Sequence, residues 1–285
     1  MKELKGVRMK SKLGVSVKGV QSIQEAEILL DGITVIAGEN GCGKSTISEI
    51  IFMLLYAWCE GKSIDDSLFE GDYTLLNTEQ IVDSVSSVAI ISDILLSDDA
   101  LKSGMWCDEN CTPSTGDSCT EILKMIEDTM RGVVTCVKGL LVYVREDGLH
   151  IALLDCSQGI KLFGIMYALL KYGGINEKTF LIVDGVDGYL HPTWLVEYAR
   201  ILVFIRKNLG TRIVISSHYP GMVSAIKYIS EKEGVQGGLN FYLAEADAEN
   251  AYRYTYAPQG NDIENIFGSF NRAFELLDGY GEYGE

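Results

Sequence analysis

The sequence predicts an α/β protein built on a mostly parallel central sheet, and two kinds of segment predict it. Short apolar runs typical of buried strands occur at residues 32–38, 180–183 and 212–216. Longer segments with apolar residues at helical spacing separate these runs, at residues 45–56, 157–172 and 192–208. Strands that alternate with helices are typical of folds in which helices cover a parallel sheet.

Four regions follow one another along the chain. Residues 1–59 are predicted to form the N-terminal part of the core, with short strands at 15–20 and 26–30 ahead of the buried strand. Residues 60–131 are more polar and acidic, and we expect a helical and loop insertion with helices near 78–101 and 121–130.

The core is predicted to resume at residues 132–277. Within it, residues 133–154 contain apolar runs separated by the turn signals Lys138-Gly139 and Asp147-Gly148, which predict a small antiparallel β subdomain. The last residues, 278–285, are acidic and glycine-rich, and we expect them to form a disordered tail.

The composition indicates a globular protein and argues against a membrane protein or a disulfide-rich one. The 285-residue chain is 47% hydrophobic, which suits a globular protein with a sizeable core. It contains no apolar run of about 18 residues and no signal peptide, so we expect a cytoplasmic protein that does not enter a membrane. Seven cysteines at irregular spacing predict free thiols and not a disulfide framework.

The charge bears on nucleic-acid binding. A formal net charge of −16 does not support it, because phosphate contacts need clustered Lys and Arg. Basic residues are concentrated near the N-terminus, at Lys2, Lys5, Arg8, Lys10, Lys12 and Lys18. We expect a solvated first strand there, and a basic strip that contacts nucleic acid is the alternative.

The strongest motif is GENGCGKS at residues 38–45, between a predicted strand and a predicted helix. Glycines let backbone N–H groups approach phosphate oxygens, and the helix N-terminus adds a partial positive charge. Lys44 is expected to reach the β and γ phosphates, and the Ser45 hydroxyl to coordinate Mg²⁺. The motif therefore predicts ATP and Mg²⁺ as cofactors. The predicted nucleotide-binding residues are Glu39, Asn40, Gly41, Cys42, Gly43, Lys44, Ser45 and Thr46.

A second motif supplies a carboxylate. The apolar run at residues 180–183 ends in Asp184, so a buried strand is expected to deliver that side chain at its C-terminal end. This is the position from which a carboxylate joins the shell of a Mg²⁺ ion beside a phosphate loop. We therefore predict Ser45 and Asp184 as metal ligands.

Several segments together resemble a known family. SVKGVQSIQEAEILLDGITVIAGENGCGKST at residues 16–46 resembles the opening of ABC-type ATPase heads of the SMC, RecF and OLD group, AAA-family ATPases of the AAA15/AAA21 kind. CSQGIK at 156–161 resembles a degenerate signature motif, GYLHP at 188–192 the end of the Walker B segment, and ISSHYPGMV at 215–223 the switch histidine segment. The resemblance implies a P-loop NTPase fold of the ABC-ATPase type.

The resemblance also implies roles for particular residues. Ser157 and Gly159 would contact the γ phosphate bound by the other subunit of a homodimer that closes on ATP. On spacing alone, an ordinary helix N-cap is the alternative for Ser157. His218 would act beside the γ phosphate. Such heads control a partner protein in DNA repair, chromosome maintenance or anti-phage defence, so a separately encoded effector is expected.

The sequence departs from this family next to Asp184. The family has Glu directly after the Walker B aspartate, where it orients or deprotonates the attacking water, and here that position is Gly185. One reading is slow ATP hydrolysis in which Asp187, or a carboxylate from elsewhere, serves as a weaker base; Asp187 and His218 are then the predicted catalytic residues. The other is a nucleotide-dependent scaffold or sensor without turnover. A transporter nucleotide-binding subunit is a third reading, which Ser157-Gln158-Gly159 fits poorly.

Overall fold

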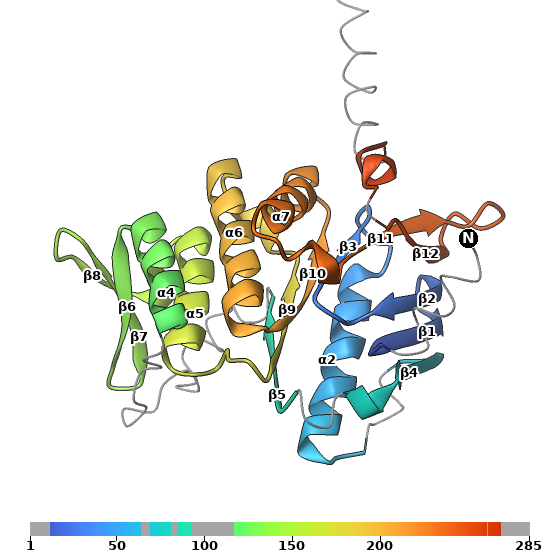
Figure 1. Ribbon diagram of the computed structural model, residues 1–285, viewed down its shortest axis with the longest axis horizontal. Helices are drawn as coiled ribbons and strands as arrows, with labels where there is room; N and C mark the ends of the chain where they lie inside the picture. Colours follow the sequence, from blue (N-terminus) through green and yellow to red (C-terminus); the bar gives the residue numbers. More distant parts are fainter. Residues whose placement is uncertain (1–11, 64–68, 81–84, 93–116, 261, 269–285) are drawn as a thin grey trace, which may run out of the picture.

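The computed structural model of the chain describes residues 12–63, 69–80, 85–92, 117–260 and 262–268. A nine-stranded sheet forms its centre, in the order β4-β1-β2-β12-β11-β3-β10-β9-β5 (Figure 1). The block from β11 to β5 is parallel throughout, whereas β1 pairs with β2 and β4 in the antiparallel sense. The strands are β1 (Gly14–Val20), β2 (Ile23–Leu29), β3 (Ile33–Ala37), β4 (Asp72–Leu76), β5 (Ser87–Ile91), β9 (Thr179–Asp184), β10 (Arg212–Ser217), β11 (Leu239–Ala246) and β12 (Tyr254–Pro258).

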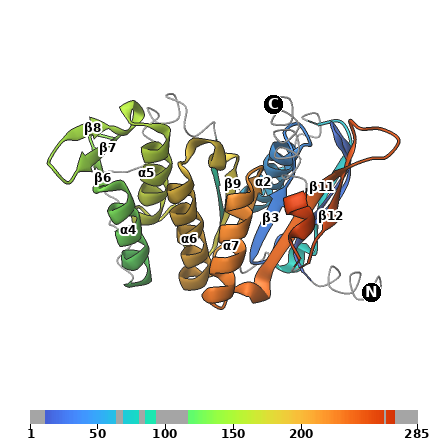
Figure 2. The same ribbon diagram turned by 90° about the horizontal axis from the view of Figure 1, so that it is seen from above.

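Helix α2 (Lys44–Glu60) lies in the curl of this sheet. It contacts β4 at one edge and β5 at the other, so the sheet wraps around the helix (Figure 2). Phe180 and Ile182 of β9 join the core beneath α2, while Leu181 and Val183 face the opposite core. The central strands are apolar along their whole length because both faces of the sheet are covered.

The opposite face is covered by α4 (Asp117–Met130), α5 (Gln158–Lys171), α6 (Pro192–Leu209) and α7 (Pro220–Lys232). Helix α4 contacts α5 and α6, and α6 contacts α7, so the helices form one layer (Figure 2). The ring of Phe163 packs edge-on against Trp194 and Tyr198 between α5 and α6. Edge-to-face aromatic pairs of this kind add stability beyond the area they bury.

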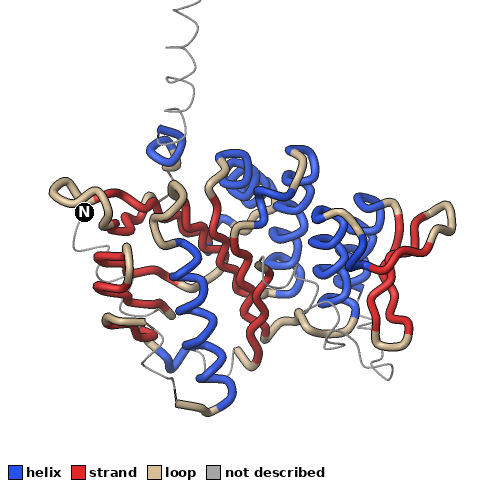
Figure 3. Tube along the Cα trace, turned by 180° about the vertical axis from the view of Figure 1, so that it is seen from behind, coloured by secondary structure: helices blue, strands red, loops and turns tan. Residues whose placement is uncertain are grey.

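A small antiparallel sheet adjoins α4 and α5, as the sequence predicts (Figure 3). It consists of β6 (Gly132–Val137), β7 (Leu140–Arg145) and β8 (His150–Ala152). Lys138 and Gly139 both have positive φ, as a two-residue hairpin turn requires. The short 3₁₀ helices are η1 (Thr78–Gln80), η2 (Leu153–Asp155), η3 (Val186–Tyr189) and η4 (Gln236–Gly238).

Part of the prediction for residues 60–131 is wrong. The helix expected near 121–130 is present as α4, but residues 87–91, expected to be helical, form strand β5 and pair with β9. Residues 72–76 likewise join the central sheet through β1. The sequence SVAII is rich in β-branched residues, and pairing with a buried strand favours that conformation over a helix. The domain boundaries themselves remain predictions.

Other expectations concern the ends of the chain and the cysteines. Residues 1–11 with most of the basic strip, and the tail at 278–285, lie outside the described residues. Cys42, Cys59, Cys119 and Cys156 are free, whereas Cys136 is disulfide-bonded, so the expectation of free thiols does not hold for Cys136. In the part of the chain that the structure describes, no helix has the length and apolar character to span a membrane.

Candidate functional site

The phosphate loop lies where β3 gives way to α2. Gly41 and Gly43 adopt positive φ values of 81° and 94°, a backbone region open to glycine. A Cβ on Gly43 would lie 2.8 Å from Cγ1 of Ile23 and 2.9 Å from Oγ of Ser22, so a side chain would collide with the turn between β1 and β2. The loop therefore needs its glycines for conformation and for space.

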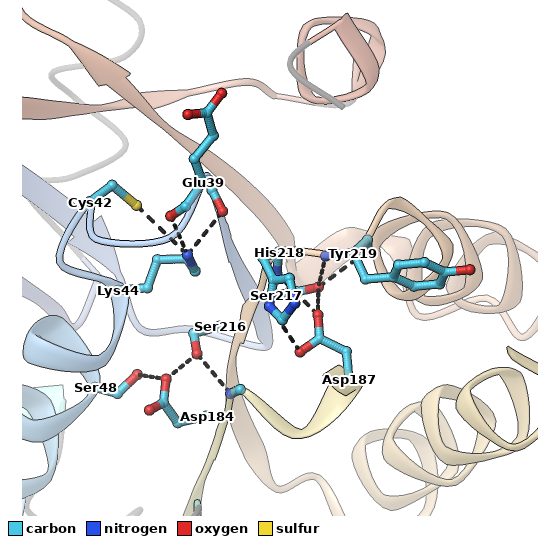
Figure 4. A network of polar contacts seen from close by, with 12 residues as sticks. Glu39, Cys42, Lys44, Ser48, Asp184, Asp187, Ser216, Ser217, His218 and Tyr219 are labelled. Atoms are coloured by element: carbon cyan, nitrogen blue, oxygen red, sulfur yellow. Dashed lines mark hydrogen bonds and ion pairs between the residues drawn. The ribbon is translucent and has the colours of Figure 1, made fainter. Parts of the chain in front are cut away.

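Lys44 opens helix α2, and its side chain folds back over the loop. Its Nζ donates hydrogen bonds to the carbonyl oxygens of Gly38 (2.9 Å) and Glu39 (2.7 Å) (Figure 4). This places an ammonium group beside the backbone amides at the start of the helix, where the helix dipole also favours an anion. Loop, ammonium and helix together suit a phosphate group.

Asp184 ends β9 beside this loop. Its Oδ1 accepts hydrogen bonds from Oγ of Ser216 and from Oγ of Ser48, the latter at 3.3 Å (Figure 4). Ser216 lies directly opposite Asp184 in the β9–β10 register, and Ser48 reaches it from α2. Burial and the charge of Asp184 raise the pKa of Glu49, the next residue on α2. The carboxyl groups of Asp184 and Glu49 therefore lie near each other at this end of the sheet.

His218 follows β10 and is held by Asp187 of η3. Oδ2 of Asp187 accepts hydrogen bonds from Oγ of Ser217 (2.7 Å) and the backbone N–H of His218 (3.0 Å). Oδ1 lies 3.5 Å from Nδ1 of His218 (Figure 4). The carboxylate side chain is fully buried, whereas that of His218 is 40% exposed. Asp187 thus faces the histidine and the backbone.

A cavity of about 530 Å³ joins these parts. Its size falls in the range of small-molecule sites. The cavity is bordered by the phosphate loop and by the ends of β9 and β10. These meet because parallel strands present their carboxyl ends at one edge of the sheet. The lining residues are Gln21, Ser22, Asn40, Gly41, Gly43, Lys44, Ser45, Thr46, Gly185, Gly188, Tyr189, Ser216 and His218.

The donor set fits Mg²⁺ bound together with a triphosphate. Ser45 lines the cavity, and Asp184 is fixed at its edge by two hydroxyl groups. In the described part of the chain, no group of three or more His, Cys, Asp or Glu side chains could hold a metal alone. Mg²⁺ usually takes one or two carboxylates and completes its shell with phosphate oxygens and water, so two protein ligands suit it.

Not every predicted residue lines the cavity. Cys42 is fully buried behind the loop, and Asp187 is buried behind His218, so neither side chain faces a ligand. The geometry of Asp187 is that of a residue that orients the imidazole, and it does not fit a base that contacts water. Glu39 is exposed outside the lining, although its carbonyl oxygen holds Lys44.

Ser157 and Gly159 also lie outside the cavity. Ser157 is exposed at the start of α5, and its hydroxyl makes no hydrogen bond that caps this helix. A Cβ on Gly159 would lie 3.3 Å from the ring of Trp194. Ser157 occupies the N-cap position of α5, as the alternative reading predicts, but without the side-chain hydrogen bond of an ordinary cap.

Six lining residues were not among the predicted site residues: Gln21, Ser22, Gly185, Gly188, Tyr189 and Ser216. Gln21 has a positive φ of 48° at the β1–β2 turn, and its Oε1 accepts a hydrogen bond from Oγ1 of Thr46 at 2.8 Å. A single Gln-Ser step gives no signal of its own. Only the pairing of distant strands brings this turn to the loop.

The fold and the arrangement of the site together resemble those of a P-loop ATPase head of the ABC type. The phosphate loop follows a central strand, the helix lies in a curled sheet, and a carboxylate and a histidine end the neighbouring strands. Comparison with known proteins agrees: residues 15–100 match the model of a family described as an AAA domain. A search of curated proteins finds no match.

The fold is also similar to that of SMC head domains in solved structures. The SMC head domain from Thermotoga maritima is 16% identical, with 88% of this chain and 99% of that chain covered and a TM-score of 0.50. An SmcHead bound to the C-winged helix domain of ScpA is 12% identical, with 87% and 98% covered and a TM-score of 0.58. An Smc head domain with an extended coiled coil, bound to the C-terminal domain of ScpA derived from Pyrococcus furiosus, is 10% identical, with 94% and 99% covered and a TM-score of 0.53. The fold is therefore that of an SMC-like ABC-type ATPase head.

Proposed function

We propose that this chain binds ATP with Mg²⁺ in the cavity and hydrolyses it slowly. The observation that carries the proposal is the composition of the lining: a phosphate loop with Lys44, the end of β9 and His218 converge, yet no Asp or Glu is among the described residues that line the cavity. Positioning and electrostatics supply most of the catalysis in phosphoryl transfer, and those parts are present. A carboxylate base at Gly185 is missing.

His218 is the residue we assign to the attacking water. The water oxygen forms a bond to the γ phosphorus as the bond to the β–γ bridging oxygen breaks, and the water proton passes to Nε2 of His218. Because Nδ1 faces Asp187, the resulting imidazolium would gain an ionic partner. Oδ1 of Asp187 is buried and makes no hydrogen bond, and a buried carboxylate oxygen of this kind is stabilised by a nearby positive charge.

We further propose that ATP brings two copies together. The exposed hydroxyl of Ser157 and the backbone near Gly159 would meet the γ phosphate held by the other copy. Two of the similar structures are SMC heads bound to parts of ScpA, which supports the idea that the dimer controls a partner protein. A role in DNA repair or anti-phage defence with a separate effector rests on this analogy.

Phosphate release under single-turnover conditions tests the proposal. We expect His218→Ala to slow release by about 100-fold, the scale of lost general base catalysis, while the Kd for ATP changes less than about threefold. His191→Ala is the matched control, because His191 is an exposed histidine outside the cavity lining. Its ring accepts a hydrogen bond from the backbone N–H of Thr193 at the start of α6. Asp187→Asn should slow release less than His218→Ala, since it removes only the orienting carboxylate.

The same assay separates the second candidate, a nucleotide-dependent sensor without turnover, which Gly185 favours. If wild-type protein binds ATP but releases phosphate no faster than Lys44→Ala, hydrolysis is ruled out and the sensor remains. If calorimetry detects no ATP binding by the wild type in the presence of Mg²⁺, both candidates are wrong.

A further inference from the structure

In the central sheet, the β11–β12 hairpin lies between two strands, β2 and β3, that border segments of the cavity lining. In the sheet, β12 pairs with β2, which follows the turn carrying Gln21 and Ser22. Its partner β11 pairs with β3, which leads into the phosphate loop. The hairpin itself contributes no residue to the cavity lining, so any influence on a ligand must pass through the residues that the hairpin contacts.

One cross-strand pair of the hairpin touches the phosphate loop directly. Ala244 of β11 lies opposite Tyr256 of β12 in the register. A Cβ on Gly38 would lie 2.8 Å from Cβ of Ala244, so the start of the loop packs on β11 without space for a side chain. The hydroxyl of Tyr256, a residue only 3% exposed, donates a hydrogen bond to the carbonyl oxygen of Cys42 at 2.8 Å.

This hydrogen bond fixes the direction of one peptide plane. The carbonyl oxygen of Cys42 and the N–H of Gly43 belong to the same trans peptide and point to opposite sides of it. Because Tyr256 holds the oxygen on the buried side, the N–H of Gly43 points away from the core, and Gly43 lines the cavity. Backbone N–H groups in this orientation are what a phosphate loop offers to an anion.

We propose that Tyr256 is a positioning residue of the nucleotide site, which holds the Cys42–Gly43 peptide so that its N–H faces the triphosphate. The inference rests on the proposed function, because it assumes that ATP binds in the cavity. Burial raises the pKa of Tyr256, so its hydroxyl stays protonated and available as a donor. At the turn end of the hairpin, Nη1 of Arg253 donates a hydrogen bond to the carbonyl oxygen of Gln21 at 2.8 Å. The hairpin therefore also contacts the β1–β2 turn that lines the cavity.

Tyr256→Phe tests the inference, because it removes the hydroxyl and keeps the ring. Tyr242→Phe is a matched control: Tyr242 is equally buried in the same core, and its hydroxyl accepts a hydrogen bond from the N–H of Leu29 at 2.9 Å. We expect Tyr256→Phe to raise the Kd for ATP with Mg²⁺ about fivefold by calorimetry, the scale of one hydrogen bond, and Tyr242→Phe to leave it unchanged. The thermal midpoints of the two variants should fall by similar amounts.

A second probe distinguishes the loop from the rest of the site. Tripolyphosphate has no nucleoside, so its Kd should rise by the same factor as that of ATP in Tyr256→Phe. Equal Kd values for ATP in wild type, Tyr256→Phe and Tyr242→Phe would overturn the inference while the proposed function stands. No ATP binding by the wild type would overturn both.

Another variant covers the case in which Tyr256→Phe does not fold. Ala244→Val adds two methyl groups to the residue that packs on Gly38, and the hydroxyl of Tyr256 remains in place. We expect it to displace the start of the loop and weaken ATP binding by a similar factor. If Ala244→Val folds and binds ATP like the wild type, the hairpin does not position the loop and the inference is wrong.

Discussion

Two helix starts in this molecule are proposed phosphate sites, and they differ in what surrounds them. Helix α2 begins at Lys44, inside a cavity that also holds the end of β9 and His218. Helix α5 begins after Ser157, whose side chain is exposed and whose helix lies in the layer on the other face of the sheet (Figure 2). One helix start borders a cavity formed by its own chain, and the other is exposed on the surface.

In the proposed function, this difference separates nucleotide binding from dimerisation. The α2 site collects its parts from strands that pair within one sheet, so a single copy can hold a ligand there. The start of α5 offers an amide-bearing helix end and one hydroxyl, which bind an anion weakly unless other groups complete the site. A second copy that presents its own bound triphosphate would complete it.

The largest expected effect is at the α2 site. Lys44→Ala removes the ammonium group from the loop and should weaken ATP binding by about 100-fold, the scale of lost charged hydrogen bonds. Isothermal calorimetry with Mg²⁺ measures it. Lys62→Ala, just beyond the other end of the same helix and exposed, should bind ATP like the wild type. Equal affinity for all three proteins would mean that the triphosphate does not occupy the loop.

The second expected effect separates the two sites. Ser157→Arg places a bulky charge at the exposed start of α5 and should abolish the ATP-dependent dimer, while the monomer keeps its affinity for ATP. Light scattering after gel filtration, with and without ATP, measures the mass. Gln236→Arg, another exposed position far along the chain in η4, should dimerise normally. A dimer of Ser157→Arg that still forms on ATP would show that α5 is not at the interface.

A smaller effect is expected from restoring a carboxylate beside Asp184. Gly185 has a φ of 64°, and a Cβ there would meet no atom within 4 Å, so Gly185→Glu fits in space. The left-handed backbone should lower the free energy of unfolding by about 1–2 kcal/mol. We expect the phosphate release rate to rise about tenfold if the missing base limits hydrolysis. Gly185→Gln controls for size and strain, and an equal rate in both variants would contradict the expectation.

The smallest effect concerns the support of Asp184. Ser216→Ala removes one hydroxyl that donates to its carboxylate, and it should weaken Mg²⁺-dependent ATP binding about threefold to tenfold. ATP binding in EDTA should not change, because the phosphate loop is untouched. Calorimetric titrations with ATP, with and without Mg²⁺, therefore measure the effect. Equal losses of affinity in both conditions would show that Ser216 acts on the nucleotide itself.

How far the sequence predicted this site depends on how local each part is. The phosphate loop, the buried strand ending in Asp184 and His218 after the next strand were predicted, because each is a short motif with its own spacing. Strand β5 was predicted as helix, because an edge strand is decided by the strand it pairs with. Gln21 and Tyr256 gave no signal, since their importance arises from the register of β2, β12 and β11.

The sequence by itself therefore determined the fold class and the chemistry of the loop, because glycine conformations, helix periodicity and the Lys-Ser pair act over a few residues. Only the tertiary structure decided which residues face the ligand. It turned Asp187 toward His218, buried Cys42 behind the loop and brought Gln21 and Ser22 to the cavity. The physical reason is that side-chain burial and orientation depend on pairing between strands that lie more than 200 residues apart in the chain, as Tyr256 and Cys42 show with their separation of 214.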